Sequence, residues 1–260
     1  MIPEIVLGSV HIPTFFLVIS LTLSLLMVFL SSRVERFGKS RAHAFNLALL
    51  LMAAGFIGGR LLHVFYEELS YYKADPIQVF YFWNGGFVFY GGMLACWLVG
   101  WLYCRIQKID FLEWADFFAP LFSLSHALGR IGCLLSGCCF GAMCVLPWSI
   151  QGRHPTALYL ILGELIIFIY LLHRERTALL QNRGPLQRGH QFMRWVFLHC
   201  LLRFEVEYFR DDFRGQFFTL PVMGTLSISQ VICLLFMITA AAFFIVSFGS
   251  SKKLYTRPPS

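Results

Sequence analysis

The sequence predicts an all-α, polytopic membrane protein with about seven transmembrane helices. Hydrophobic residues make up 58% of the 260 residues and charged residues only 13%, whereas a soluble domain carries about 25% charged residues. Seven apolar runs are long enough, or nearly so, to cross a bilayer, which takes about 20 residues in a helix. We therefore expect a single integral-membrane domain over residues 1–260.

The seven runs account for most of the chain. They are Ile12–Leu30, His43–Tyr66, Gly86–Cys104, Trp114–Leu134, Pro155–His173, Phe192–Phe209 and Leu226–Phe248. No basic segment precedes the first run, and Glu4 lies there instead, so we expect this run to be a retained helix and not a cleaved signal peptide. The fourth and sixth runs are the weakest, because each contains charged or titratable side chains.

Basic residues alternate between the connecting segments. They follow the first, third, fifth and seventh runs, as Arg33, Arg36, Lys39, Arg41, Arg105, Lys108, Arg174, Arg176, Arg183, Arg188, Lys252, Lys253 and Arg257. After the second run, Lys73 stands among three acidic residues. Because Lys and Arg gather in cytoplasmic loops, we expect the amino terminus outside and the carboxyl terminus in the cytoplasm. The net charge of +7 then reflects membrane orientation, and we expect no nucleic-acid partner.

This orientation collects the polar residues of the apolar runs in one outer layer. The layer holds Arg60, Asn84, Tyr90, Arg130, Arg153, His154, Arg203, Glu207, Arg210 and the pairs Gly85-Gly86 and Gly91-Gly92. Membrane proteins place such groups around a shared cavity, because each would be costly in contact with lipid. The sequence therefore predicts a polar cavity near the outer surface.

Arg130 lies in the stretch HALGRIGCLLSGCCFG, with no acidic residue nearby in sequence. Its planar guanidinium suits a carboxylate or phosphate. The neighbouring Gly129 and Gly132, and Gly141 further on, lack side chains and allow another backbone or a ligand to come close. The alternative is a helix end whose arginine extends to the membrane interface.

The sixth run carries His199, Arg203 and Glu207 four residues apart, with Arg210 three further on. This spacing puts them on one helical face. Arg203 and Glu207 can form an intrahelical ion pair, which is one complete explanation. The pair leaves the other arginines without a partner, an excess that suits phosphate, although Asp211 and Asp212 can offset some of it.

The segment Arg153-His154-Pro155-Thr156 is typical of a loop that ends at a helix start, because proline is tolerated in the first turn. His154 is either a residue of the helix start or an available proton acceptor, since histidine as a residue type titrates near neutral pH.

Four of the eight cysteines lie between Cys133 and Cys144, in a segment expected outside the membrane. Three interpretations stay open. In the first, the thiols form a disulfide if that compartment is oxidising. In the second, they bind a metal, although the C-x4-C-C-x4-C spacing matches no common zinc or iron–sulfur pattern. In the third, they are buried apolar side chains.

Five motifs, in order and spacing, resemble the prolipoprotein diacylglyceryl transferase family of the bacterial inner membrane. GFIGGRLLHVFY resembles the family's second helix, and ADPIQVFYFWNGG with FVFYGG the following loop and third helix. GRIGCLLSGCCFG is similar to the signature G-R-x-G-N-F-x-N-x-E-x-x-G, RHPTALY to R-H-P-S-Q-L-Y-E, and RFEVEYFRDD to the arginine-glutamate-arginine helix. The family's fold, with seven helices and the amino terminus outside, agrees with the orientation derived above.

The sequence departs from these motifs at several polar positions. Cys133 and Ser136 replace the two asparagines of the signature, and Cys138 replaces its glutamate. Tyr90 stands in place of the histidine of an H-G-G motif, and Leu160 in place of the last glutamate of R-H-P-S-Q-L-Y-E. The arginines and glycines remain, whereas several hydrogen-bonding and acid–base groups do not.

The resemblance implies transfer of diacylglyceryl from phosphatidylglycerol to the lipobox cysteine thiol of a preprolipoprotein signal peptide, without a cofactor or metal. Arg130 and Arg203 would hold the phosphate, Glu207 would orient Arg203, and Tyr90 or His154 would accept the thiol proton. The residues expected to line the substrate site are Arg60, Gly91, Gly92, Gly129, Gly132, Gly141, Arg153 and Arg210. The implied location is the inner membrane, in contact with its lipids.

Two other functions stay open. One is a relative that binds phospholipid without catalysis, having kept the phosphate-binding arginines and lost the base. The other is a membrane thiol or metal redox protein that uses the cysteines between Cys133 and Cys144.

Overall fold

A computed structural model describes residues 4–8, 10–180, 187–211, 217–220 and 224–255. The residues that lie outside this description include Arg183, Asp212 and Arg257, and the side chains of Asn84, Lys252 and Lys253. The chain divides into two compact units. The first unit comprises Met1–Leu26 and Leu112–Ser260, and the second comprises Met27–Phe111.

Each of the seven apolar runs coincides with a long helix. The helices are α1 (Thr14–Phe37), α2 (Arg41–Leu62), α4 (Phe89–Gln107), α5 (Phe111–Ser136), α6 (Thr156–Leu180), α7 (His190–Glu207) and α8 (Ile228–Tyr255). Between α2 and α4 lie the π-helix η1 (His63–Glu67), the short helix α3 (Leu69–Ala74) and the 3-10 helices η2 (Pro76–Phe80) and η3 (Phe82–Asn84). The predicted helical fold is confirmed.

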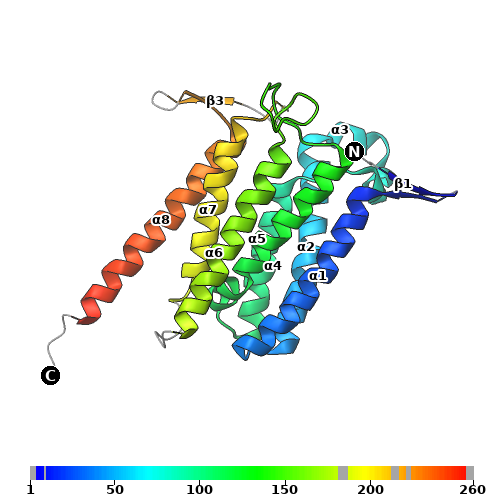
Figure 1. Ribbon diagram of the computed structural model, residues 1–260. Helices are drawn as coiled ribbons and strands as arrows, with labels where there is room; N and C mark the ends of the chain where they lie inside the picture. The colour runs from blue at the N-terminus through cyan, green and yellow to red at the C-terminus, as the bar shows by residue number, and fades with distance from the viewer. Residues whose placement is uncertain (1–3, 9, 181–186, 212–216, 221–223, 256–260) are drawn as a thin grey trace. The chain divides into compact units, whose positions relative to one another are not determined.

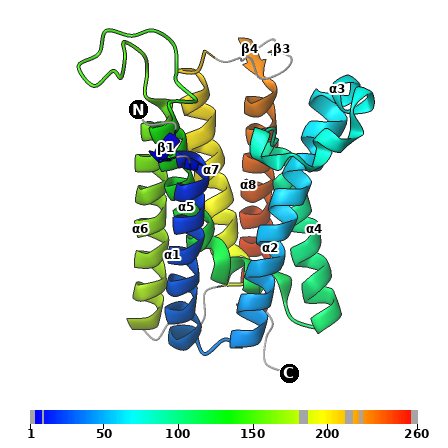
Figure 2. The same cartoon turned by 90° about the vertical axis from the view of Figure 1, so that its right-hand side faces the viewer.

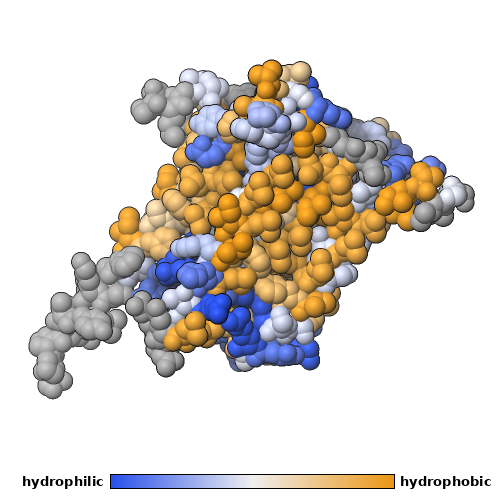
Figure 3. Space-filling view, viewed as in Figure 1, coloured by the Kyte–Doolittle hydropathy of each residue, from blue (hydrophilic) through white to orange (hydrophobic). Residues whose placement is uncertain are grey.

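Five helices in the described part of the chain are long and apolar enough to cross a membrane, so the protein is a polytopic membrane protein. They are α1, α2 with η1, α5, α6 and the Ile228–Ser247 part of α8. Hydrophobic side chains cover the helices seen in Figure 3, and hydrophilic ones gather at their ends. The fourth run, expected to be weak, is among the five as α5, whereas α4 and α7 are not. Helix α7 carries charges, and α4 contains glycines, tyrosines and tryptophans.

Two short β-hairpins are an addition to the predicted all-α fold. Strands β1 (Glu4–Leu7) and β2 (Val10–Pro13) pair antiparallel, as do β3 (Phe217–Leu220) and β4 (Gly224–Ser227). Strands of four residues are too short to show a clear alternation of apolar and polar side chains, which is why the sequence did not predict them.

In the second unit, glycines let α2 and α4 pack at very close range (Figure 2). A methyl group added at Gly58 would lie 2.5 Å from the carbonyl oxygen of Gly91, and one at Gly92 would lie 2.8 Å from that of Gly55. Small residues at such crossings allow membrane helices to associate through close backbone contact. These glycines fix the crossing of the two helices.

In the first unit, α6 and α7 pack together and α7 packs against α8 (Figure 1). Ala119 of α5 and Leu171 of α6 form one core cluster, with Trp195 of α7 packed against it. Asp116 of α5 accepts hydrogen bonds from the backbone N–H groups of Gly189, at 2.7 Å, and Phe192, at 2.8 Å. A carboxylate at this position satisfies the unpaired N–H groups at the start of α7.

Candidate functional site

The loop after α5 and the end of α7 are joined at one end of the first unit. The N–H of Ala142 donates to the carbonyl of Phe209, and the N–H of Gly141 to that of His154, both at 2.8 Å. A methyl group at Gly141 would lie 2.7 Å from Cβ of His154, so only glycine fits where these segments cross. The crossing brings the predicted residues Arg153, His154 and Arg210 to the same end of the unit.

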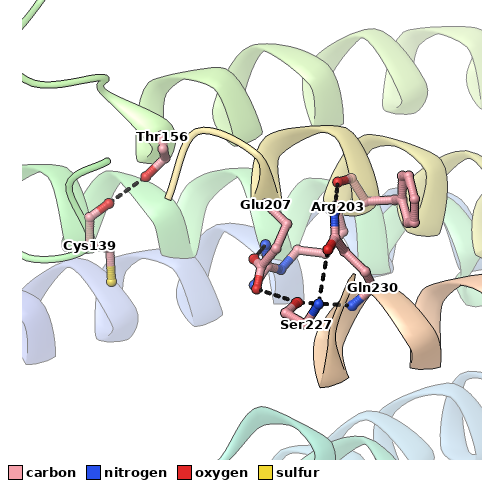
Figure 4. A network of polar contacts seen from close by, with 7 residues as sticks. Cys139, Thr156, Arg203, Glu207, Ser227 and Gln230 are labelled. Carbon is pink, nitrogen blue, oxygen red and sulfur yellow. Dashed lines mark hydrogen bonds and ion pairs between the residues drawn. The ribbon is translucent and has the colours of Figure 1, made fainter. Parts of the chain in front are cut away.

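Arg203 and Glu207 form an intrahelical ion pair in α7, with both side chains nearly buried (Figure 4). Ser227 donates to the other oxygen of Glu207 at 2.9 Å. Ser227 and Gln230 form a capping box at the start of α8: the Gln230 N–H donates to the Ser227 hydroxyl oxygen, and the Ser227 N–H to the Gln230 side chain. Glu207 is thus fixed between its own helix and the cap of the next.

Arg130 lies on α5, about one and a half turns before the helix ends at Ser136. Its side chain is half-buried. It forms no ion pair or hydrogen bond with any residue that the structure describes. Its neighbour Gly129 faces open space, since an added methyl group would meet nothing within 4 Å. Arg130 therefore has donors available for an anion, with room beside it.

Gly132 has a different role from Gly129. A methyl group at Gly132 would lie 3.1 Å from the ring of Phe15 on α1, within the same unit. The missing side chain at Gly132 therefore accommodates a neighbouring helix.

The loop residues Arg153 and His154 are engaged in the loop itself. Arg153 donates to the Gly141 carbonyl and pairs with Asp211, both at 3.3 Å, in an exposed position. Nδ1 of His154 lies 3.1 Å from the Tyr159 hydroxyl, which also accepts from Trp148. Nε2 of His154 is then the ring nitrogen on which a proton transfer would occur.

Three cysteines meet where α5 ends. The Sγ atoms of Cys133, Cys138 and Cys139 all lie within 4.8 Å of one another, and each cysteine in the chain is a free thiol. Hydrogen bonds from the thiols of Cys133 and Cys138 lower the pKa of Cys139, and the charge of Arg210 acts in the same direction. The alternative in which these cysteines are simply buried does not hold for Cys138, which is exposed.

In the second unit, Arg60 uses all its donors on the loop that joins α2 to α4. Its Nε donates to the carbonyl of Val79 at 3.1 Å, and its terminal nitrogens donate to the carbonyls of Gln78, Tyr81, Gly85 and Gly86. A guanidinium has five N–H groups, and here five carbonyls accept from them. Arg60 therefore holds this loop, and its expected role in substrate binding stays a prediction.

Tyr90, Gly91 and Gly92 lie in the first turn of α4 in the second unit. Tyr90 is half-buried, with its ring centroid 5.7 Å from that of Phe89. A methyl group at Gly91 would lie 2.5 Å from Cβ of Leu62. The two glycines are therefore required by the contact of α4 with α2, whether or not a ligand approaches them.

The first unit contains a buried polar cluster that was not predicted from the sequence. Glu164 of α6 is fully buried; it accepts from Ser123 of α5 at 2.7 Å and forms a hydrogen bond with His199 of α7. Nδ1 of His126 lies 3.5 Å from the same carboxylate. The position of Glu164 could have predicted this cluster, because a carboxylate inside an apolar run usually faces partners in the protein interior.

These features define a class of protein. It is a polytopic membrane protein in which helical arginines, a helical carboxylate and a loop with a histidine lie at one end of a unit. The chain matches the family model of prolipoprotein diacylglyceryl transferase over residues 4–246. The chain therefore belongs to the prolipoprotein diacylglyceryl transferase family, whose members are membrane transferases.

Individual relatives agree with the family match. The phosphatidylglycerol–prolipoprotein diacylglyceryl transferase of Clostridium tetani is 27% identical over 228 residues, which cover 84% of this chain and 88% of the relative. The protein of the same description from Nitratidesulfovibrio vulgaris strain DP4 is 32% identical over 187 residues, or 68% and 67% of the two chains. That of Geobacter sulfurreducens is 35% identical over 166 residues, or 60% of each chain.

Proposed function

We propose that this protein transfers the diacylglyceryl group of phosphatidylglycerol to the lipobox cysteine of a preprolipoprotein signal peptide. The thiol sulfur forms a thioether bond to the glycerol carbon as the bond from that carbon to the phosphate oxygen breaks. Glycerol phosphate leaves, and the thiol proton passes to a base. Family membership and the descriptions of the relatives support this reaction.

The available donors of Arg130 are the observation that carries the proposal. A half-buried guanidinium beside the open space at Gly129 suits the phosphate of a lipid headgroup. Arg203 supplies a second positive charge, held in place by Glu207 and, through it, by Ser227. Charge that develops on the leaving phosphate is stabilised by such fixed donors.

Two residues are candidates for the base. His154 lies in the first unit with the arginines and offers Nε2, whereas Tyr90 lies in the second unit. Tyrosine as a residue type has a pKa near 10 and must be strongly perturbed to act as a base. We therefore favour His154.

The test is rescue of a bacterial strain depleted of its own transferase, with labelled phosphatidylglycerol to measure transfer. The natural sequence should rescue growth. His154→Ala should lose roughly 10²–10⁴-fold of transfer, the usual contribution of a general base, and Tyr90→Phe should stay near the natural rate. The reverse result would move the base to Tyr90. Full activity in both variants would remove the proposed proton step.

We also propose that both units belong to one transferase domain in the bacterial inner membrane, with seven crossings and the amino terminus outside. Reporters fused after Ser260 and in the segment from Glu67 to Asn84 should then report opposite sides of the membrane. The same side for both would contradict the seven-helix topology.

A second function is a relative that binds phospholipid without transfer. The tyrosine at position 90 and the cysteine at position 138, where the family motifs have histidine and glutamate, favour it. Such a protein would co-purify with phosphatidylglycerol and fail to rescue the depleted strain.

A further inference from the structure

We propose that Cys133, Cys138 and Cys139 form a binding site for one thiophilic metal ion, of the class of Zn²⁺ or Cu⁺. The three Sγ atoms lie within 4.8 Å of one another. A Zn–S bond of about 2.3 Å separates two sulfurs on a tetrahedral ion by about 3.8 Å. The thiols therefore need to approach by no more than about 1 Å to share an ion. This site does not depend on the proposed transfer.

The end of α5 brings the first two thiols together. Gly137 has a positive φ of 75°, its N–H donates to the carbonyl of Leu134, and the N–H of Cys138 donates to the carbonyl of Cys133. These two bonds form a Schellman motif, in which the second residue after the helix folds back onto the last turn. Hydrophobic side chains usually meet there, and in this chain both positions are cysteines.

The third thiol is held by the loop. Cys139 has a φ of 65°, a left-handed conformation that few residues other than glycine adopt. Its carbonyl accepts a hydrogen bond from Thr156 at the start of α6, at 2.5 Å (Figure 4). Two residues later, Gly141 is bonded to His154 and paired with Arg210. The loop is thus fixed on both sides, and the thiols are arranged before any ion arrives.

Charge and access also suit a metal. Each thiol that binds releases its proton to solvent, so three thiolates around a divalent ion carry one net negative charge. The positive charge of Arg210 acts on Cys139 and that of Arg130 acts on Cys133, so both arginines offset that charge. Cys138 is exposed and the other two thiols are half-buried, which leaves a path for the ion.

The donor set selects the metal class. Thiolates without nitrogen or oxygen ligands favour Cu⁺ and Zn²⁺ over harder cations. In the other group of possible ligands in the described chain, His126, Glu164 and His199, the carboxylate of Glu164 is already engaged, because it hydrogen-bonds to His199 and to Ser123. The similar family signature has asparagine and glutamate where Cys133 and Cys138 stand, so the site is a departure of this chain from that signature.

The test uses the full chain, purified in detergent under reducing conditions through a tag without histidine or cysteine. Cd²⁺ is the probe, because its bonds to thiolates absorb in the ultraviolet. We expect one tightly bound Cd²⁺ per chain, and Cd²⁺ should displace any Zn²⁺ bound beforehand, because soft thiolates prefer the softer ion. Cys138→Ser should lose affinity by more than the roughly 10–100-fold that loss of an outer-shell partner costs.

Two variants serve as controls. Cys144→Ser removes a half-buried thiol of the same loop that lies outside the cluster, and His199→Gln removes a ligand of the other group. Both should bind Cd²⁺ as the natural chain does. Equal affinity in Cys138→Ser, or no binding by the reduced natural chain, would overturn the proposal.

Alkylation of the protein as isolated separates a metal from a disulfide. If a metal is bound, a chelator alone should make all three thiols reactive. Protection that yields to a reductant and not to a chelator would replace the metal site with a disulfide.

Discussion

Arg60 in the second unit and Arg130 in the first lie near the ends of apolar helices, and the structure uses them in opposite ways. Arg60 is only 6% exposed and donates to five backbone carbonyls. Arg130 is half-buried and bonds to no residue in the described chain. Burial alone would select Arg60 as the functional residue. The number of donors that remain available favours Arg130, in line with the proposed function.

The comparison separates stability from chemistry. An arginine whose N–H groups all meet carbonyls holds a loop together, because each carbonyl left without a donor costs about 1–3 kcal/mol when buried. An arginine with available donors contributes little to folding and can bind an anion. Substitutions at the two positions should therefore affect different measurements.

The largest expected effect is on folding. Arg60→Ala should lower the free energy of unfolding in detergent by about 3 kcal/mol or more, because several loop carbonyls lose their donor together. The free energy of unfolding of Arg60→Lys, which has three donors in place of five, should lie between those of the natural chain and Arg60→Ala. Chemical or thermal unfolding measures both. A change below about 0.5 kcal/mol in Arg60→Ala, the range of ordinary surface substitutions, would show that the loop does not depend on this residue.

Arg130→Ala should reduce transfer by roughly 10²–10³-fold, the cost of losing a donor to developing negative charge. Its free energy of unfolding should stay within about 1 kcal/mol of the natural value. Arg130→Lys should restore little, because an ammonium lacks the planar fork of the guanidinium. The exposed Arg176 of α6 offers a matched control, and Arg176→Ala should leave transfer unchanged. If Arg130→Lys transferred at the rate of the natural chain, a positive charge alone would be sufficient at this position.

Two glycines extend the comparison to packing. Gly91→Ala should destabilise the second unit by about 1–3 kcal/mol, the usual cost of overpacking, because its methyl group would press on Leu62 of α2. Gly129→Ala, in open space on α5, should be neutral or stabilising by up to about 1 kcal/mol. Thermal unfolding of both variants checks this. If Gly129→Ala folds well and still loses transfer, the open space beside Arg130 is part of the substrate site.

The smallest effect concerns Ser227. Ser227→Ala removes both the cap of α8 and the bond to Glu207, so it should cost about 1 kcal/mol of stability. Ser227→Thr keeps the hydroxyl and should recover most of that loss. Unfolding in detergent compares the two. Equal stability in Ser227→Ala and the natural chain would show that Arg203 alone holds Glu207.

The sequence by itself determined the elements and their local pairs. Apolar runs of about 20 residues predicted the seven long helices, because a helix that crosses lipid must be apolar over that length. The four-residue spacing of Arg203 and Glu207 predicted their ion pair, because such residues are neighbours on one helical face. The short hairpins gave no comparable signal.

Only the tertiary structure decided what each polar group contacts. The carbonyls that occupy Arg60 lie 18 to 26 positions along the chain, and Glu164 meets partners on two other helices. The sequence shows that a glycine is present, and the fold decides that Gly91 makes room for a helix while Gly129 faces open space. Helical periodicity arises from neighbours a few residues apart, whereas the partners of a donor or a missing side chain depend on which segments meet in space.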